Sequence, residues 1–155
     1  MEKDLNFSSC IQCGQCILAC PTGALHEKSY FDTIQEAINK EEVTVVAQYT
    51  PSVAVSIAEE FDIRSGKDLT GIINAKKKKI GIDKVYDSSF GADLYTVEEA
   101  SELAERLDKE EKMPMLSSSC PAWIKYVEQA HPELLPYLST VKSPEQITGS
   151  VIKNR

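Results

Sequence analysis

The sequence predicts an α/β fold in which a layer of parallel strands is flanked by helices and preceded by a small cysteine-rich segment. Two observations favour this class. Short β-branched runs alternate with helical stretches over residues 29–116, and four of the five cysteines fall between residues 10 and 20. Strands that alternate with helices pair in parallel, because the helix provides the crossover that a parallel connection needs. We expect two domains, with a boundary between residues 28 and 29.

Local signals predict the individual elements. Asp32 is a candidate cap for a helix to residue 39, and Pro51 suits the first turn of another helix. Thr96 and Glu99 have the spacing of a capping box, which predicts a helix to about residue 111. The remaining expected elements are strands over residues 43–47, 84–86 and 113–116, a helix over residues 69–80, and short helices after residue 120 that are punctuated by Pro132, Pro136 and Pro144.

The composition of the 155 residues is that of an ordinary globular chain, with 42% hydrophobic and 26% charged residues. Its net charge of -7 would repel a phosphate backbone, so we expect no nucleic-acid partner. No apolar run approaches the roughly 20 residues that span a bilayer, and the N-terminus lacks the apolar region of a signal peptide. We therefore expect a cytoplasmic protein without a membrane span.

The clustered cysteines have a distinctive spacing. Cys10, Cys13, Cys16 and Cys20, followed by Pro21, spell C-x2-C-x2-C-x3-C-P. This is the bacterial ferredoxin run for 4Fe–4S clusters, and soft thiolates suit iron. The alternatives are a zinc site, which favours separate C-x2-C pairs, and unligated core cysteines. In two-cluster ferredoxins the fourth cysteine of the run ligates the other cluster, so we expect one or two 4Fe–4S clusters.

The fifth cysteine, Cys120, stands in the segment SSSCPAW, between an expected strand and an expected helix. The positive end of a helix dipole favours the thiolate form of a cysteine at the helix N-terminus. On its own residues, Cys120 is either a metal ligand or a buried free cysteine.

Four stretches together resemble the iron-only (FeFe) hydrogenase family. In chain order they are CIQCGQCILACPTGAL, VVAQYTPSVAVSIAEEF, FGADLYTVEEASEL and SSSCPAWIKYVEQAHPELLPYLSTVKSPEQITGSVIK. The first is similar to half of the family's two-cluster ferredoxin domain, and the last contains a variant of its T-S-C-C-P-x-W motif. The resemblance implies a ferredoxin-like segment over residues 1–28 and the N-terminal part of a catalytic domain over residues 29–155.

The active site of that family is the H-cluster, a 4Fe–4S cubane joined to a diiron unit and held by four cysteines. The resemblance implies that Cys120 is the first of these ligands. The other three belong to later motifs that these 155 residues do not contain. We therefore expect an H-cluster only if a missing C-terminal portion is supplied, and a chain that is a fragment or a divergent, sensory member.

The resemblance also implies a proton route from a cysteine beside the diiron unit through Glu99, Ser139 and Glu102 to the surface. Ser119 occupies the place of the proton-donating cysteine. A serine hydroxyl is far less acidic than a thiol, whose unperturbed pKa is about 8.5, so it is a poor proton donor. We expect this change to lower turnover.

Four further residues are assigned by the resemblance to the cofactor pocket: Thr50, Pro51, Ser52 and Glu145. The activity implied is reversible reduction of protons to hydrogen. The expected redox partner is a ferredoxin or an NAD(P)H-linked electron-transfer subunit, and the missing C-terminal portion is a second candidate partner. The alternatives are a non-catalytic, hydrogenase-like iron–sulfur assembly protein and a stand-alone electron-transfer module.

Overall fold

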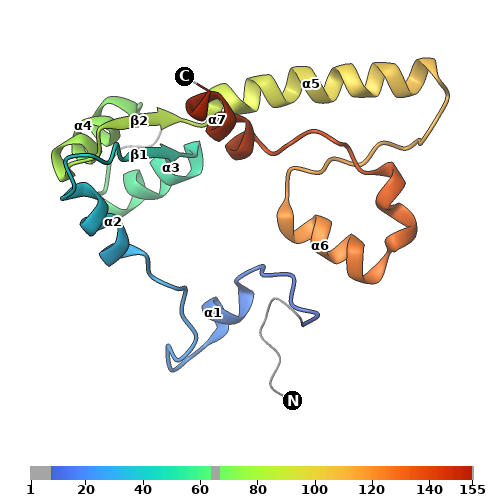
Figure 1. Cartoon of the computed structure of the whole chain (residues 1–155). Coiled ribbons are helices and arrows are strands. Elements are labelled where there is room, and N and C mark those ends of the chain that lie inside the picture. The colour runs from blue at the N-terminus through green and yellow to red at the C-terminus, as the bar shows by residue number, and fades with distance from the viewer. Residues whose placement is uncertain (1–7, 64–66, 155) are drawn as a thin grey trace. The chain divides into compact units, whose positions relative to one another are not determined.

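The computed structural model describes residues 8–63 and 67–154 of the chain (Figure 1). No helix in this part of the chain is long and apolar enough to cross a membrane. The elements are α1 (Gln15–Ala19), α2 (Phe31–Ile38), β1 (Val46–Tyr49), α3 (Pro51–Glu60), α4 (Thr70–Ile80), β2 (Lys84–Asp87), α5 (Ser89–Asp108), α6 (Pro121–Ala130), a 3-10 helix (Pro132–Tyr137) and α7 (Pro144–Lys153).

The chain forms two compact units, and one helix belongs to both. The first unit contains the described residues of 1–28 and 94–143, and the second contains those of 29–93 and 144–155. Helix α5 begins in the second unit and ends in the first. The predicted domain boundary between residues 28 and 29 stays a prediction.

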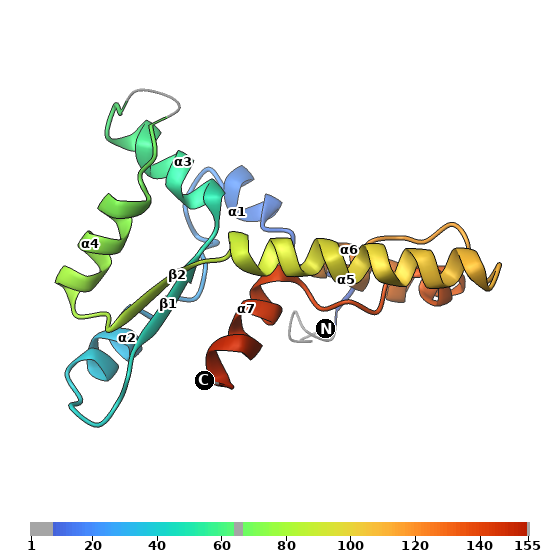
Figure 2. The same cartoon turned by 90° about the horizontal axis from the view of Figure 1, so that it is seen from above.

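The second unit is built on two parallel strands with helical crossovers, as the sequence predicts. β1 pairs with β2 in the register Val46 to Lys84 and Tyr49 to Asp87 (Figure 2). Its core consists of Tyr49, Leu69 and Ile73, each at most 4% exposed. The partly buried apolar residues around this core are Ala54, Ile57, Ala58, Ile63 and Val85.

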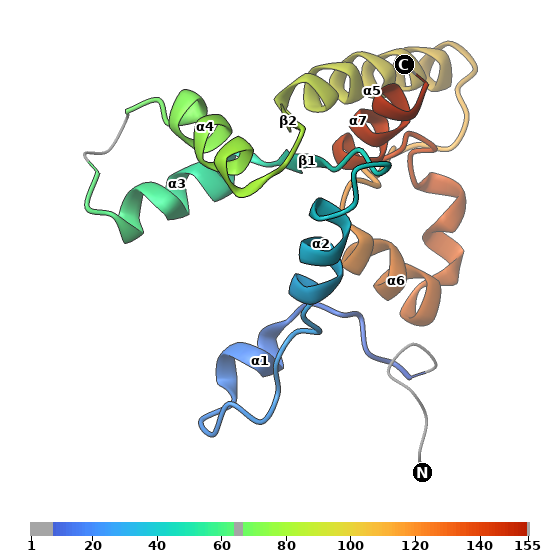
Figure 3. The same ribbon diagram turned by 60° about the vertical axis from the view of Figure 1, so that its left-hand side comes forward.

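Helix α7 packs against the start of α5 within the second unit (Figure 3). Gly91 makes this approach possible, because a Cβ atom there would lie 2.1 Å from Thr148 Oγ1 and 2.3 Å from the Pro144 carbonyl oxygen. Gln48 Nε2 also donates a hydrogen bond to the Glu145 carbonyl oxygen at 3.3 Å. These contacts fix the start of α7 beside the end of β1.

The first unit is organised around α6 and the segments that flank it. Val127 of α6 is completely buried. Leu116 and Leu138 form an isolated parallel bridge, in which Leu116 N donates to the Tyr137 carbonyl at 2.8 Å and Ser139 N donates to the Leu116 carbonyl at 2.7 Å. This bridge holds the segment before Cys120 next to the segment that contains Ser139.

Four sequence expectations about element boundaries are wrong. The strand expected over residues 43–47 begins three residues later, because Val46–Tyr49 are the residues that pair with β2. Helix α5 starts seven residues before Thr96, because Asp87 Oδ1 accepts hydrogen bonds from the backbone and hydroxyl of Ser89 and caps the helix there. Helix α2 starts at Phe31, whose N–H bonds to Ser29 Oγ, so Asp32 lies in the first turn. Residues 113–116 form no strand beyond the single bridge at Leu116.

Candidate iron–sulfur segment and hydrogen-bonded proton route

The four clustered cysteines lie in one short loop and helix of the first unit. Gly14, at φ 77°, adopts the left-handed conformation that starts α1 between Cys13 and Cys16. All four are free thiols, of which Cys13 and Cys16 are exposed. Within the described residues, no three His, Cys, Asp or Glu side chains are close enough together to hold a metal ion, so the four sulfurs do not converge in this structure.

The donor set fits an iron–sulfur cluster chemically. It consists of thiol groups alone, and cluster ligands must be thiolates. Hydrogen bonds from the Leu25 backbone and then from Thr22 lower the pKa of the Cys20 thiol from 9.0 to about 7. Gln12 N also donates to Cys10 Sγ at 3.4 Å. The loop therefore stabilises negative charge on sulfur, as a cluster ligand requires.

The lowered pKa of Cys20 predicts its reactivity in the chain without iron. At pH 7 about half of this thiol is ionised, against about 1% for a thiol with a pKa of 9.0. We expect iodoacetamide to alkylate Cys20 about fivefold faster in the folded chain than in urea, after allowing for the weaker nucleophilicity of an acidic thiolate. T22V should slow the reaction and T33V should not; equal rates for both variants, measured by peptide mass spectrometry, would contradict the assignment.

Cys120 is the N-cap residue of α6, and its thiol is exposed. Pro121 follows at the first helical position, where its missing N–H costs no hydrogen bond. The buried Ser118 hydroxyl donates to the Val141 carbonyl at 3.0 Å, which anchors the loop before Cys120. Ser119, at the predicted proton-donor position, is half-buried between these two residues.

Glu102 and Ser139 are in direct contact. Ser139 Oγ donates to Glu102 Oε2 at 2.8 Å, and the Thr140 backbone N–H donates to the same oxygen at 3.0 Å. Partial burial alone would raise the pKa of Glu102, but hydrogen bonds from Ser139, Thr140 and Arg106 together bring it below its usual value. The structure therefore brings together two of the predicted proton-route residues, which are 37 positions apart in the sequence.

Arg106 hydrogen-bonds to Glu102 of this pair and was not predicted from the sequence. Arg106 is 7% exposed, and its guanidinium donates to Glu102 Oε1 from Nε at 3.1 Å and from Nη2 at 2.5 Å. It also donates to the carbonyl oxygens of Lys112, Tyr137 and Leu138. An arginine four residues after a glutamate predicts only a surface helix pair, so its burial could not be anticipated.

Glu99 contacts a tyrosine that the sequence analysis also missed. Tyr95 Oη donates to Glu99 Oε1 at 2.5 Å and lies 2.6 Å from Ser117 Oγ. A tyrosine at a half-buried helical position normally indicates packing, and its partner Ser117 is 22 residues away. The described contacts include no direct hydrogen bond between Glu99 and either Ser139 or Glu102.

The predicted pocket residues lie together in the second unit. Thr50, Pro51 and Glu145 line a cavity of about 280 Å³ with residues from the start of α5. Thr50 Oγ1 and Ser52 Oγ are hydrogen-bonded at 2.7 Å. Thr50 precedes α3 and Glu145 lies in the first turn of α7, so the cavity lies among the starts of α3, α5 and α7.

Comparison with known proteins identifies both parts of the chain. Residues 43–155 match the model of the iron only hydrogenase large subunit, C-terminal domain, and residues 4–26 match that of the 4Fe-4S binding domain. Over 81% of its length, the chain superposes on 33% of a variant of apo FeFe-hydrogenase HydA1 from Chlamydomonas reinhardtii, with a TM-score of 0.73 and 34% identity.

Relatives include hydrogenases and assembly factors. Iron hydrogenase 1 of Clostridium pasteurianum is 44% identical over 133 residues, which are 86% of this chain and 23% of that protein. The NADP-reducing hydrogenase subunit HndD of Solidesulfovibrio fructosivorans is 38% identical over 98% of this chain and 27% of its own length. The cytosolic iron-sulfur assembly component 3 of Rattus norvegicus is 31% identical over 99% of this chain and 35% of its own length.

The chain thus spans about a quarter to a third of the length of these relatives. Its fold is the mixed helix and strand arrangement of the FeFe-hydrogenase domain, with a 4Fe-4S binding segment at the N-terminus. The cofactors of this chemistry are 4Fe–4S clusters and, in the family, the H-cluster. The chain belongs to the iron-only hydrogenase large-subunit family.

Proposed function

We propose that this hydrogenase-like iron–sulfur protein takes part in the reversible reduction of protons to hydrogen, with electrons carried by 4Fe–4S clusters. The observation that carries the proposal is the 2.8 Å hydrogen bond between Ser139 and Glu102. The family resemblance makes these residues neighbours on a proton route, and the fold joins them from distant parts of the sequence. A partly buried carboxylate with a hydroxyl partner can accept a proton and pass it on.

In this proposal the cysteines have two tasks. Cys10, Cys13, Cys16 and Cys20 hold 4Fe–4S iron, and Cys120 provides one ligand of the H-cluster. When bound, the H-cluster supplies the redox chemistry that combines two protons and two electrons into hydrogen. The five cysteines of these 155 residues are thereby all assigned, so the other three H-cluster ligands are not among them.

The chain's own residues bring protons toward Cys120. Glu102 takes up a proton from the surface, and Ser139 and Glu99 extend the route inward. Ser119 replaces the thiol at its inner end, so the last transfer is slow and turnover is low. Slow turnover suits a divergent or sensory member of the family. Thr50, Pro51, Ser52 and Glu145 contribute to the cofactor pocket.

The proposed electron donor is a ferredoxin or an NAD(P)H-linked subunit, which the similarity to an NADP-reducing hydrogenase subunit supports. Residues 1–28 act as the entry point for electrons and residues 29–155 as part of the catalytic domain. The cytoplasmic location predicted from the sequence is part of the same proposal.

The first test is the iron and acid-labile sulfide content of the anaerobically reconstituted chain. We expect about four irons for each chain and, after reduction, the S = 1/2 electron paramagnetic resonance signal of one 4Fe–4S cluster. C13S should abolish most of this signal, whereas C120S should retain it, because Cys120 lies outside the ferredoxin run. Equal iron loss in both variants would contradict the division of tasks between the cysteines.

A second candidate function is iron–sulfur assembly without hydrogen chemistry. It is supported by the assembly component of Rattus norvegicus, which covers nearly the whole chain, and by Ser119, which removes the proton-donating thiol. It predicts transfer of a labile cluster to an acceptor protein. An electron-transfer module, the third possibility, would exchange electrons but would neither transfer its cluster nor evolve hydrogen.

A further inference from the structure

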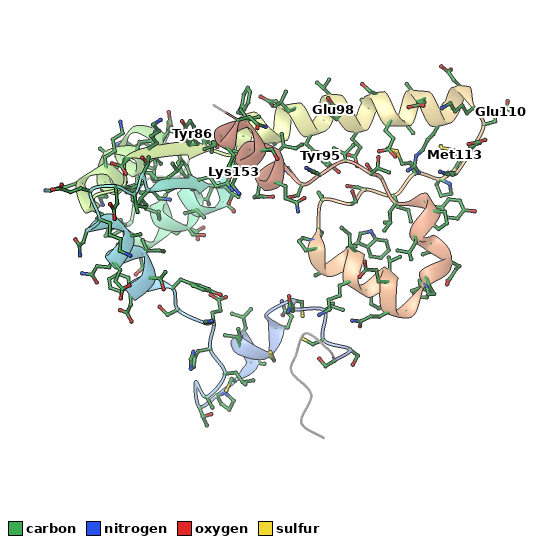
Figure 4. The ribbon with its side chains drawn as sticks, viewed as in Figure 1. Tyr86, Tyr95, Glu98, Glu110, Met113 and Lys153 are labelled. Carbon is green, nitrogen blue, oxygen red and sulfur yellow. The ribbon has the colours of Figure 1, made fainter. Side chains whose placement is uncertain are left out.

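Tyr95 lies between a predicted proton-route carboxylate and the loop that leads to Cys120 (Figure 4). We infer that the Tyr95 hydroxyl is the hydrogen-bonded link through which Glu99 exchanges protons with the serine loop formed by residues 117–119. The inference rests on the proposed function and adds a residue to its proton route. Tyr95 acts through its neighbours, so it is a positioning and relaying residue.

The geometry gives the Tyr95 hydroxyl partners on both sides. On one side Glu99 Oε1 lies 2.5 Å from Oη, and both residues are on the same face of α5, four positions apart. On the other side Ser117 Oγ lies 2.6 Å away. A phenol has one proton and two lone pairs, so it can donate to Glu99 while it accepts from Ser117.

Without Tyr95, no described contact connects Glu99 to the serine loop. The Ser118 hydroxyl donates to the Val141 carbonyl, and the Ser117 hydroxyl is the one hydrogen-bonded to Tyr95 of α5. The Tyr95 side chain is thus the bridge between a carboxylate on the helix and a hydroxyl in the loop before Cys120. Replacing it with phenylalanine would remove one oxygen and interrupt the connection.

Inward transfer through this link is balanced at every oxygen. Protonated Glu99 gives its proton to Tyr95 Oη, while the original Oη proton passes to Ser117 Oγ. Ser117 would give its own proton to an acceptor on the cofactor side, which the H-cluster would supply when bound. One O–H bond breaks and one forms at each hydroxyl, so tyrosine and serine end neutral. Rotation of the hydroxyls restores the starting orientation, in which Tyr95 donates to Glu99.

The environment of Tyr95 is consistent with a neutral relay. Partial burial is the main cause that raises the pKa of Tyr95, and its hydrogen bond to the Glu99 carboxylate raises it further. The side chains of Ser117 and Ser119 act in the opposite direction. The phenol therefore keeps its proton near neutral pH and can pass protons on by exchanging them.

The link can be tested by NMR on the complete natural polypeptide that carries this sequence, labelled with ¹³C at tyrosine Cζ. Y95F identifies the Tyr95 signal among the six tyrosines. We expect E99Q to lower the pKa of Tyr95 and S117A to raise it, and both to shift its Cζ signal at pH 7. The matched control is E98Q, because Glu98 is an exposed carboxylate on the same helix. Unchanged Tyr95 signals in E99Q and S117A would overturn the inference.

A second measurement tests whether the Tyr95 hydroxyl transfers protons or only holds the serine loop in place. In the complete polypeptide we expect Y95F to reduce hydrogen evolution about tenfold and to increase the solvent deuterium isotope effect on its rate. E98Q should change neither. A wild-type rate and isotope effect in Y95F would overturn the relay. Absence of hydrogen evolution from every variant would instead overturn the proposed function, while the NMR shifts would still support the link from Glu99 to the loop.

Discussion

Replacing Ser119 with cysteine is expected to raise hydrogen evolution by the complete polypeptide about 100-fold. General acid catalysis is efficient when the pKa of the donor lies near the working pH, and a thiol with a pKa of about 8.5 meets this condition where a serine hydroxyl does not. Ser119 immediately precedes Cys120 at the start of α6, so the new thiol would stand next to the proposed cluster ligand.

The matched control is S118C, which adds a thiol one residue further from Cys120. The Ser118 side chain is buried and directed at the Val141 carbonyl, so its replacement adds no proton donor to the route. Hydrogen evolution should be measured with a chemical reductant for the wild type and both variants at equal iron content. An unchanged rate in S119C would refute the assignment of Ser119 to the end of the route and would favour the assembly function.

Replacing Arg106 with methionine is expected to destabilise the first unit by about 3 kcal/mol. The substitution keeps most of the aliphatic volume but removes five hydrogen bonds to Glu102 and to three backbone carbonyls. It also leaves the Glu102 carboxylate, only 15% exposed, without its countercharge. Breaking a buried ion pair from one side is costly because the remaining charge stays partly desolvated.

Chemical denaturation followed by circular dichroism measures this loss. K109M is the matched control on the same helix, because Lys109 pairs with Glu105 at an exposed surface and its removal should leave the midpoint nearly unchanged. Equal midpoints for R106M and the wild type would show that the carbonyl groups and Glu102 find other partners.

The fold was predictable where a single segment carries the signal. The β-branched run before Pro51, the proline at the first turn of α3 and the alternation of strand and helix predict the parallel pair β1 and β2. The start of α5 was not predictable from Thr96, because the capping side chain of Asp87 is paired with Ser89 at the end of a strand. The sequence offers two possible helix starts, at Ser89 after Asp87 and at the capping-box spacing of Thr96 and Glu99. The structure uses the first.

The site was predictable where chemistry is fixed by spacing or by resemblance. The ferredoxin run of cysteines needs no tertiary information. The resemblance assigned Glu102 and Ser139 to one route, and the structure contains a hydrogen bond between them. Tyr95 and Arg106 were not predictable, because each acts through contacts with residues more than 20 positions away. Nothing in their immediate neighbours distinguishes them from residues of an ordinary amphipathic helix.

The hydrogen bonds of Glu102 link the proposed proton transfer to the pH dependence of folding stability. The Glu102 carboxylate accepts hydrogen bonds from both Ser139 and Arg106. Protonating this carboxylate therefore weakens its ion pair with Arg106 in the first unit. Because folding lowers the pKa of Glu102, its contribution to stability is fully present above the pKa of the unfolded chain and is lost as the pH falls through the lower pKa of the folded chain. In the proposed proton route, proton uptake and folding depend on the same carboxylate, so the pH at which the route can operate has a lower limit.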